Sequence, residues 1–147
     1  MLVTIEEDKQ LPPDLLVLKV KETNQKIIKI AKELRDGHQA LTVRQKERHI
    51  IISVKEVIRI FSSQKRVYVV TSTDEFLIDR RLYELDEKLP SYFVRISNTE
   101  IINLNAVQEF ELSKTGNIII YLKNKDITSS SRRYLKQVKE RLLWLNK

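Results

Sequence analysis

The sequence predicts a mainly β domain of the α+β class, built from antiparallel strands with short helices and preceded by a small strand–helix segment. Apolar residues recur with a helical period before about residue 40 and alternate with a period of two after residue 50. The chain has 147 residues and a hydrophobic fraction of 41%, which is enough for a packed core. Only two glycines are present, so the strands should be joined by short, ordinary turns.

Residues 1–43 are predicted to form the strand–helix segment. Two apolar stretches favour extended structure, and Pro12-Pro13 separates them (2–7 and 15–20). The following residues predict an amphipathic helix that ends at Gly37. Its apolar face would be formed by Ile27, Ile28, Ala31 and Leu34. The polar residues 37–49 then favour a linker.

Residues 44–147 are predicted to form the β domain. Its strand-like stretches are separated by short polar breaks, which is typical of hairpins; they lie at 50–61, 66–72, 75–78, 92–97, 101–104, 106–113, 117–123 and 126–130. The first of them is long enough to contain a bulge or tight turn.

Two helices are predicted within this domain. The stretch 79–90 has Asp79 as a possible N-cap, leucines on one stripe and Pro90 as a stop. The last helix follows the serines that begin at Ser129. Its buried face is expected to contain Leu135, Val138, Leu142 and Leu145.

The residue inventory does not favour an enzyme. There is no cysteine, the only histidines are His38 and His49, and no phosphate-cradling glycine loop or nucleophile motif is present. The acidic run Glu6-Glu7-Asp8 is better explained as a solvated edge than as a metal site. We therefore expect no catalytic residue, metal, cofactor or small-molecule substrate. Neither a signal peptide nor a membrane-spanning apolar run is apparent, so a cytoplasmic protein is expected.

The charge distribution suggests a polyanionic partner. Basic and acidic residues balance in residues 1–43, so the whole net charge of +7 lies in residues 44–147. Three polar, basic places could contact nucleic acid, because Arg suits guanine, Asn suits adenine, and hydroxyl groups suit phosphate. They contain Gln64, Lys65 and Arg66; Arg95, Ser97 and Asn98; and Ser131, Arg132 and Arg133. Taken singly, each is explained more simply as solvated surface, a turn residue or half of an ion pair.

The two arginines of the third place stand where a helix should begin. Cations at a helix N-terminus lose up to about 1 kcal/mol against the helix dipole. A bound phosphate would reverse that sign by meeting both Arg132 and Arg133 and the free backbone N–H groups. The placement therefore favours a phosphate-contacting site over a purely structural helix.

Two separated motifs also resemble a known family. The stretches FVRISNTEIINL (93–104) and SSSRRYLKQVKERL (129–142) resemble the LytTR DNA-binding domain of bacterial transcription regulators, over about residues 45–147. The family pattern is F-x-R-x-x-x-S/T-x-x-V/I-N-L, a hairpin, and then S-R-R with an amphipathic helix. The residues that match it are Phe93, Arg95, Thr99, Ile102, Asn103 and Leu104, followed by Ser131, Arg132, Arg133 and Leu135.

The resemblance implies an elongated antiparallel β-sandwich that reads double-stranded DNA through loops, without a recognition helix. Direct-repeat sites are implied. The matched contact positions are Lys65 or Arg66, then Asn98, then Arg133. This chain departs from the family at Ser97, where a basic residue or His is common. It departs again at Glu100, where an aromatic is common, and Glu100 is expected to face away from DNA.

The short chain resembles stand-alone regulators, which are often restrained by a small membrane protein. Residues 1–43 are too short for a receiver domain and are expected to dock on the β domain or to pair with a second copy, giving a homodimer. Two other functions stay open. A single-stranded nucleic-acid binder could stack bases on Tyr68, Phe93 and Tyr121, and a non-enzymatic interaction module could hold an acidic or membrane partner.

Overall fold

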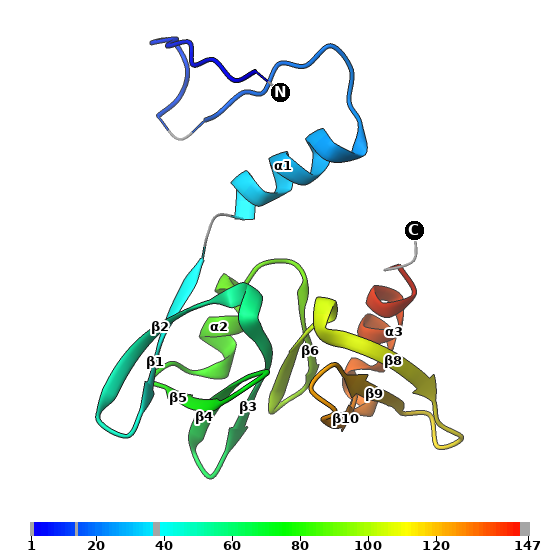
Figure 1. The fold of residues 1–147 in the computed structure, drawn as a ribbon. Helices are drawn as coiled ribbons and strands as arrows, with labels where there is room; N and C mark the ends of the chain where they lie inside the picture. Colours follow the sequence, from blue (N-terminus) through cyan, green and yellow to red (C-terminus); the bar gives the residue numbers. More distant parts are fainter. Residues whose placement is uncertain (1, 14, 37–38, 145–147) are drawn as a thin grey trace. The chain divides into compact units, whose positions relative to one another are not determined.

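The computed structural model describes residues 2–13, 15–36 and 39–144, which belong to two compact units, Met1–Gly37 and His38–Lys147 (Figure 1). The division falls a few residues before the expected boundary at 43/44. Strand β1 (Ala40–Gln45) lies entirely within the second unit. No described helix is long and apolar enough to cross a membrane.

The first unit contains the predicted helix, α1 (Gln25–Asp36). Asn24 Oδ1 accepts a hydrogen bond from the Ile27 N–H at 3.0 Å, which satisfies a backbone donor near the start of the helix. Gly37, the predicted stop, lies outside the described residues. The strands expected at 2–7 and 15–20 are absent from the described residues of this unit. That prediction was wrong because an extended stretch gains little without a partner strand.

The second unit contains ten strands and two α-helices in its described residues. Seven strands form one antiparallel sheet in the order β2-β1-β5-β4-β3-β7-β6, and three form another in the order β10-β9-β8. After β1, the strands are β2 (Arg48–Ser53), β3 (Val57–Ser63), β4 (Arg66–Thr71), β5 (Glu75–Ile78), β6 (Phe93–Ser97), β7 (Glu100–Asn103), β8 (Val107–Leu112), β9 (Ile118–Leu122) and β10 (Ile127–Ser129). The predicted mainly β, antiparallel architecture is confirmed.

Residues 37–38 of the predicted linker lie outside the described residues, and over residues 40–49 the prediction was wrong. Strands β1 and β2 form an antiparallel hairpin there, with Val43 opposite Ile50. The polar residues in this stretch misled the prediction because they alternate with apolar ones that face the core, and Val43 is only 1% exposed.

Two apolar cores lie on opposite faces of the large sheet. Successive residues of a strand point to opposite faces, so Ile101 of β7 packs in the first core and Ile102 in the second. The first core includes Leu82 and Leu85 of α2 (Leu82–Lys88), and the second includes strand β9 and the helix α3 (Leu135–Trp144). The small sheet and α3 thus cover one face while α2 covers the other.

The helix predictions are confirmed in position but not in every detail. Val138 and Leu142 of α3 are at most 1% exposed, as expected, whereas Leu145 lies outside the described residues. Asp79 does not cap α2. The N-cap is Arg81, which makes no side-chain capping bond, and Asp79 pairs instead with Arg44.

Asn103, the last residue of β7, is a buried amide with a structural role. Its side chain is 3% exposed; Nδ2 donates to the Val57 carbonyl and Oδ1 accepts from the Asn105 N–H, both at 2.8 Å. These bonds join the two short 3₁₀ turns that bend the chain between strands, η1 (Val54–Glu56) and η2 (Leu104–Ala106). An aliphatic side chain of similar size would leave the buried Val57 carbonyl and the Asn105 N–H without these hydrogen bonds.

Candidate nucleic-acid interface

Three connecting segments come together at one end of the second unit. They are the β3–β4 hairpin turn, the β6–β7 turn, and the segment between β10 and α3. The Ser62 N–H donates to the Thr99 carbonyl at 2.8 Å, and the Ser131 N–H donates to the Ile96 carbonyl at 2.9 Å. In Figure 1 all three lie toward the lower side of the unit. We call them the three-loop face; it contains all three basic places predicted from the sequence.

The β3–β4 turn presents two cations on a tight hairpin. Ser63 pairs with Arg66, so the loop consists of Gln64 and Lys65, with φ angles of 51° and 65°. Two left-handed residues define the mirror-image turn that matches strand twist, a turn in which Asn-Gly is the usual choice. Gln64, Lys65 and Arg66 are all exposed. Lys65 and Arg66 have no acidic partner within ion-pair distance among the residues the structure describes.

The β6–β7 turn is held rigid by its own neighbours. Arg95 donates from Nε to the Ser97 carbonyl at 3.1 Å and from a terminal nitrogen to the Asn98 carbonyl at 2.8 Å. The Ser97 hydroxyl accepts from the Thr99 N–H at 3.2 Å. Arg95 and Ser97, both predicted to contact DNA, therefore shape the turn from inside and leave Asn98 and Thr99 exposed.

The third segment places its arginines in a 3₁₀ turn, η3 (Arg132–Tyr134), before α3 begins at Leu135. Arg132 and Arg133 are exposed and lie outside the first α-helical turn, which lessens the cost expected from the helix dipole. Ser131, predicted as a phosphate contact, has its hydroxyl oxygen buried without a hydrogen-bond partner among the described atoms.

Tyr134 joins the second and third segments, and the sequence analysis missed it. Its hydroxyl donates to Asn98 Oδ1 at 3.2 Å. The guanidinium carbons of Arg133 and Arg95 lie 5.8 and 5.9 Å from the centre of its ring. The aromatic residue directly after Ser-Arg-Arg was the signal that could have revealed this contact. The structure thus brings Arg95, Asn98 and Arg133 together around one ring.

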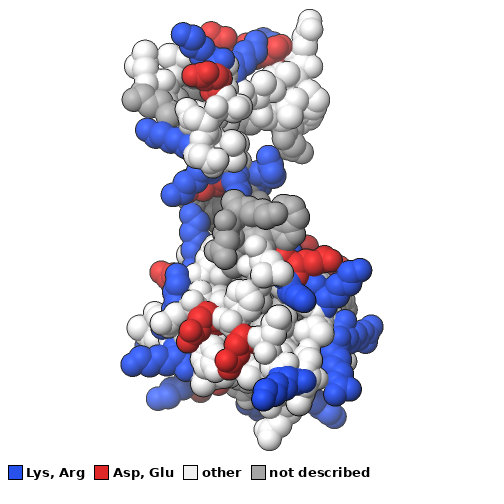
Figure 2. All heavy atoms as spheres, turned by 90° about the vertical axis from the view of Figure 1, so that its right-hand side faces the viewer, with Lys and Arg blue, Asp and Glu red and all other residues white. Residues whose placement is uncertain are grey.

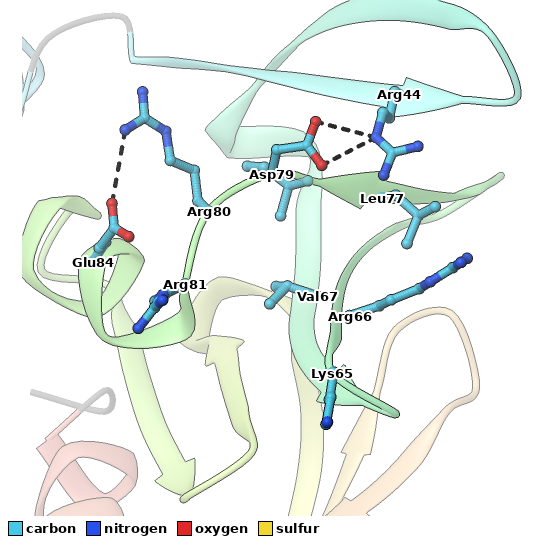
Figure 3. A pocket seen from close by; sticks show the side chains of 10 residues that line it. Arg44, Lys65, Arg66, Val67, Leu77, Asp79, Arg80, Arg81 and Glu84 are labelled. Carbon is cyan, nitrogen blue, oxygen red and sulfur yellow. Dashed lines mark hydrogen bonds and ion pairs between the residues drawn. The ribbon is translucent and has the colours of Figure 1, made fainter.

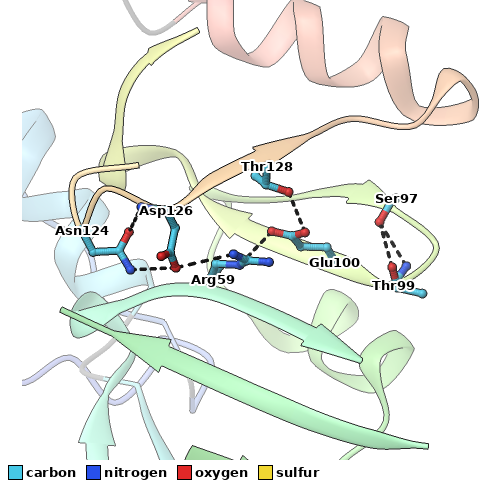
Figure 4. A network of polar contacts seen from close by, with 7 residues as sticks. All are labelled: Arg59, Ser97, Thr99, Glu100, Asn124, Asp126 and Thr128. Carbon is cyan, nitrogen blue, oxygen red and sulfur yellow. Dashed lines mark hydrogen bonds and ion pairs between the residues drawn. The ribbon is translucent and has the colours of Figure 1, made fainter. Parts of the chain in front are cut away.

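A buried polar network underlies the three-loop face (Figure 4). Arg59 Nε of β3 lies 3.0 Å from Glu100 Oε2 of β7, and Thr128 of β10 donates to Glu100 Oε1 at 2.8 Å. A second Arg59 nitrogen lies 3.5 Å from Asp126. Glu100 is 7% exposed, so its side chain is buried within this network. The network connects the large sheet to the small one.

Burial raises the pKa of the Glu100 carboxyl above its ordinary value of 4.5, and the attraction of Arg59 and the Thr128 hydrogen bond only partly oppose this. The folded protein therefore holds this proton more tightly than the unfolded chain does. Between pH 4.5 and the raised pKa, stability falls as pH rises.

The aromatic residues do not form an open stacking platform. Phe93 is 6% exposed, and Tyr121 donates its hydroxyl to Glu111 at 2.8 Å. Tyr68 stacks on Phe61 with ring centres 5.1 Å apart, and the Arg59 guanidinium lies 4.9 Å from the Phe61 ring. These contacts favour structural roles over single-strand stacking.

The surface of the second unit is rich in basic side chains. Figure 2 shows Lys and Arg outnumbering Asp and Glu on one face of the second unit. No cluster of His, Cys, Asp and Glu able to hold a metal ion occurs among the residues searched in the described part of the chain. The exposed cations and amides of the three-loop face can meet phosphates and base edges.

Comparison with known proteins places the chain in a family. The LytTr DNA-binding domain matches residues 47–143. Proteins of Staphylococcus aureus strains NCTC 8325 and COL, named as uncharacterized HTH-type transcriptional regulators, are 40% identical over 129 residues, covering 88% of this chain and 87% of theirs. This protein therefore belongs to the LytTR family of DNA-binding domains, a family of transcription regulators that are not normally enzymes.

A solved structure shows the same fold. The LytTr DNA-binding domain of a Bacillus cereus methyl-accepting/DNA response regulator superimposes with a TM-score of 0.69 at 19% identity, covering 72% of this chain and 98% of that one. Five strands separate α1 from α2 and five separate α2 from α3. The described residues therefore contain no helix-turn-helix, although the staphylococcal names include that term.

The pKa of Glu100 leads to a testable pH effect. Glu100→Gln keeps the oxygen that accepts from Thr128 but removes the titration. The stability of the wild type relative to this variant should fall as pH rises above 4.5, because the native state loses its advantage in proton binding. Denaturant unfolding of both proteins between about pH 4 and 7 measures the difference in their free energies of unfolding. The titration of the other carboxyl groups is the same in both proteins and cancels in this difference. If the stability of the wild type relative to Glu100→Gln instead rose with pH, the attraction of Arg59 would outweigh burial in setting the pKa of Glu100.

The strained hairpin leads to a second test, in which stability and binding should move in opposite directions. Lys65→Gly should raise the free energy of unfolding by up to about 1 kcal/mol, because glycine adopts the left-handed conformation without strain. It should also weaken DNA binding by removing a cation. Lys125→Gly is the matched control, since Lys125 has φ 74° in the β9–β10 turn, at the other end of β10 from η3.

The Lys125→Gly variant should be stabilised similarly but bind DNA normally. Thermal or denaturant unfolding and DNA titration of both variants provide the comparison. Equal losses of DNA affinity in the two variants would argue against a role of the β3–β4 turn in DNA binding.

Proposed function

We propose that this protein regulates transcription by binding specific sites on double-stranded DNA through the three-loop face. The observation that carries the proposal is the convergence of Lys65, Asn98 and Arg133 from three separate connections at one end of the sheet. Membership of a DNA-binding family supports the nature of the partner. A regulator of this kind acts on chromosomal DNA, so we place it in the cytoplasm.

Direct reading and backbone contact would be divided among these residues. Arg133 is exposed and lies beside the Tyr134 ring, which restricts its motion and suits a guanine edge. Asn98 keeps its side-chain nitrogen for an adenine or phosphate, while its oxygen accepts from Tyr134. Lys65, Arg66 and Arg132 would contact phosphates. Arg95, Ser97 and Ser131 would position these groups rather than touch DNA.

A repeated DNA site would be read most effectively by two copies of the chain. The first unit supports this, because its apolar residues include Leu16 at 67% exposed and Ile28 at 52% exposed, with no described partner strand. We propose that this unit pairs with its counterpart in a second copy and that two LytTR domains occupy direct repeats. A small membrane protein that restrains the regulator would be a further partner, suggested by the kind of stand-alone regulator that the chain resembles.

The role of Arg133 is tested on a duplex carrying the protein's own upstream promoter region and on a scrambled duplex. Arg133→Ala should lose about 1–3 kcal/mol of affinity for the promoter and little for the scrambled duplex, because it removes a base contact. Lys55→Ala is the control; Lys55 is exposed at the opposite end of β3 from the turn. Unchanged promoter preference in Arg133→Ala would contradict direct reading by this residue.

The dimer is tested by removing residues 1–37, which form a unit of their own. Sedimentation equilibrium should show a dimer for the full chain and a monomer for the truncated one. Affinity for a single half-site should be retained, whereas affinity for the repeated site should fall. A monomeric full chain at working concentrations would contradict pairing through this unit.

A further inference from the structure

A basic groove extends from the three-loop face along the side of the large sheet (Figure 3). It lies between the β3–β4 turn, strand β5 and the segment that leads into α2. Five cationic side chains line it, against two carboxylates. The cations are Arg44, Lys65, Arg66, Arg80 and Arg81. The apolar side chains that line it include Val67 and Leu77.

The two carboxylates in the groove are already neutralised. Arg44 Nε lies 3.1 and 3.2 Å from the two oxygens of Asp79. Arg80 turns toward Glu84, 3.7 Å away on the first turn of α2. Lys65, Arg66 and Arg81 have no acidic partner in the described part of the chain, and all three are exposed. The groove therefore offers three uncompensated positive charges to a ligand.

We propose that this groove holds the phosphate backbone of the DNA that flanks the bases read by the three-loop face. The inference rests on the proposed function, because Lys65 and Arg66 belong both to the groove and to that face. Duplex DNA carries one negative charge per about 1.7 Å of its axis, so a surface continuous with the reading loops meets further phosphates. The groove would add affinity and length of contact but no base preference.

Asp79 gives the groove a residue whose removal should strengthen binding. It is 71% exposed and carries the only carboxylate that lies beside Arg44 among the described ion pairs. Replacing it by Asn removes a negative charge and frees the Arg44 guanidinium for phosphate. Because the pair is exposed, its loss should cost little stability.

The experiment compares a short duplex that covers only the recognised site with a duplex extended by about one helical turn on each side, about 10 base pairs. For the wild type, the extended duplex should bind more tightly and with a steeper salt dependence. Arg81→Ala should lose much of the extra affinity for the extended duplex. It should also flatten the slope of log affinity against log salt concentration by about one unit. Asp79→Asn should bind the extended duplex several-fold more tightly. Lys55→Ala, outside the groove, should behave as the wild type does.

The preference for promoter over scrambled sequence should be the same in all of these variants, because the groove contacts no base. Arg133→Ala, measured alongside, separates the two ideas. If Arg133→Ala abolishes promoter preference while Arg81→Ala changes neither the extra affinity for the extended duplex nor the salt dependence of binding, the groove proposal is contradicted. The same result would support the three-loop face as the reading site. Saturable binding of inorganic phosphate that is lost in Arg81→Ala but does not compete with DNA would also overturn the proposal, in favour of a small anion.

Discussion

The register of β3 against β7 is the constraint on which the DNA-facing end depends. Phe61 lies opposite Glu100, and the Ser62 N–H closes onto the Thr99 carbonyl at 2.8 Å. This pairing fixes the β3–β4 turn beside the β6–β7 turn. A slip of one residue would turn Glu100 to the opposite face of the sheet, away from Thr128, and would exchange the cores into which Ile101 and Ile102 pack. The position of the reading loops is therefore set by the same contacts that bury the core.

We infer that the charged network helps to make that register specific. An apolar core tolerates several packings, whereas the Arg59–Glu100 pair and the Thr128 hydrogen bond need the partners that this register brings together. Such pairs add little net stability because desolvation opposes the attraction, and the raised pKa of Glu100 reflects that cost. We infer that Glu100 maintains loop geometry in this chain. Nearer the surface, Arg95 and Tyr134 also hold the β6–β7 turn in place through their hydrogen bonds to it.

Periodicity and turn residues were enough to predict most strands, the helices and the three basic places, because those patterns are local. Residues 40–49 were misjudged since a polar, alternating hairpin at a sheet edge looks like a linker. Asp79 was misjudged since its partner, Arg44, is distant in sequence. The aromatic residue at position 134 was visible in the sequence, but its contacts with Arg95 and Asn98 depend on how η3 packs against β6 and could not be read from it. The same packing half-buries Arg95 and buries the Ser131 hydroxyl oxygen. The sequence could identify candidate residues, but it could not separate those that position the loops from those proposed to contact DNA.

The central claim is that three separate loops act as one DNA-reading face. Amide chemical shifts of the isotope-labelled full chain, followed while promoter duplex is added, test it most directly. The account predicts that the largest changes fall together at residues 64–66, 98–99 and 132–134, with the buried Arg59–Glu100 region little affected. Changes concentrated on α1 or on the exposed side of α3, with these three segments unchanged, would contradict it.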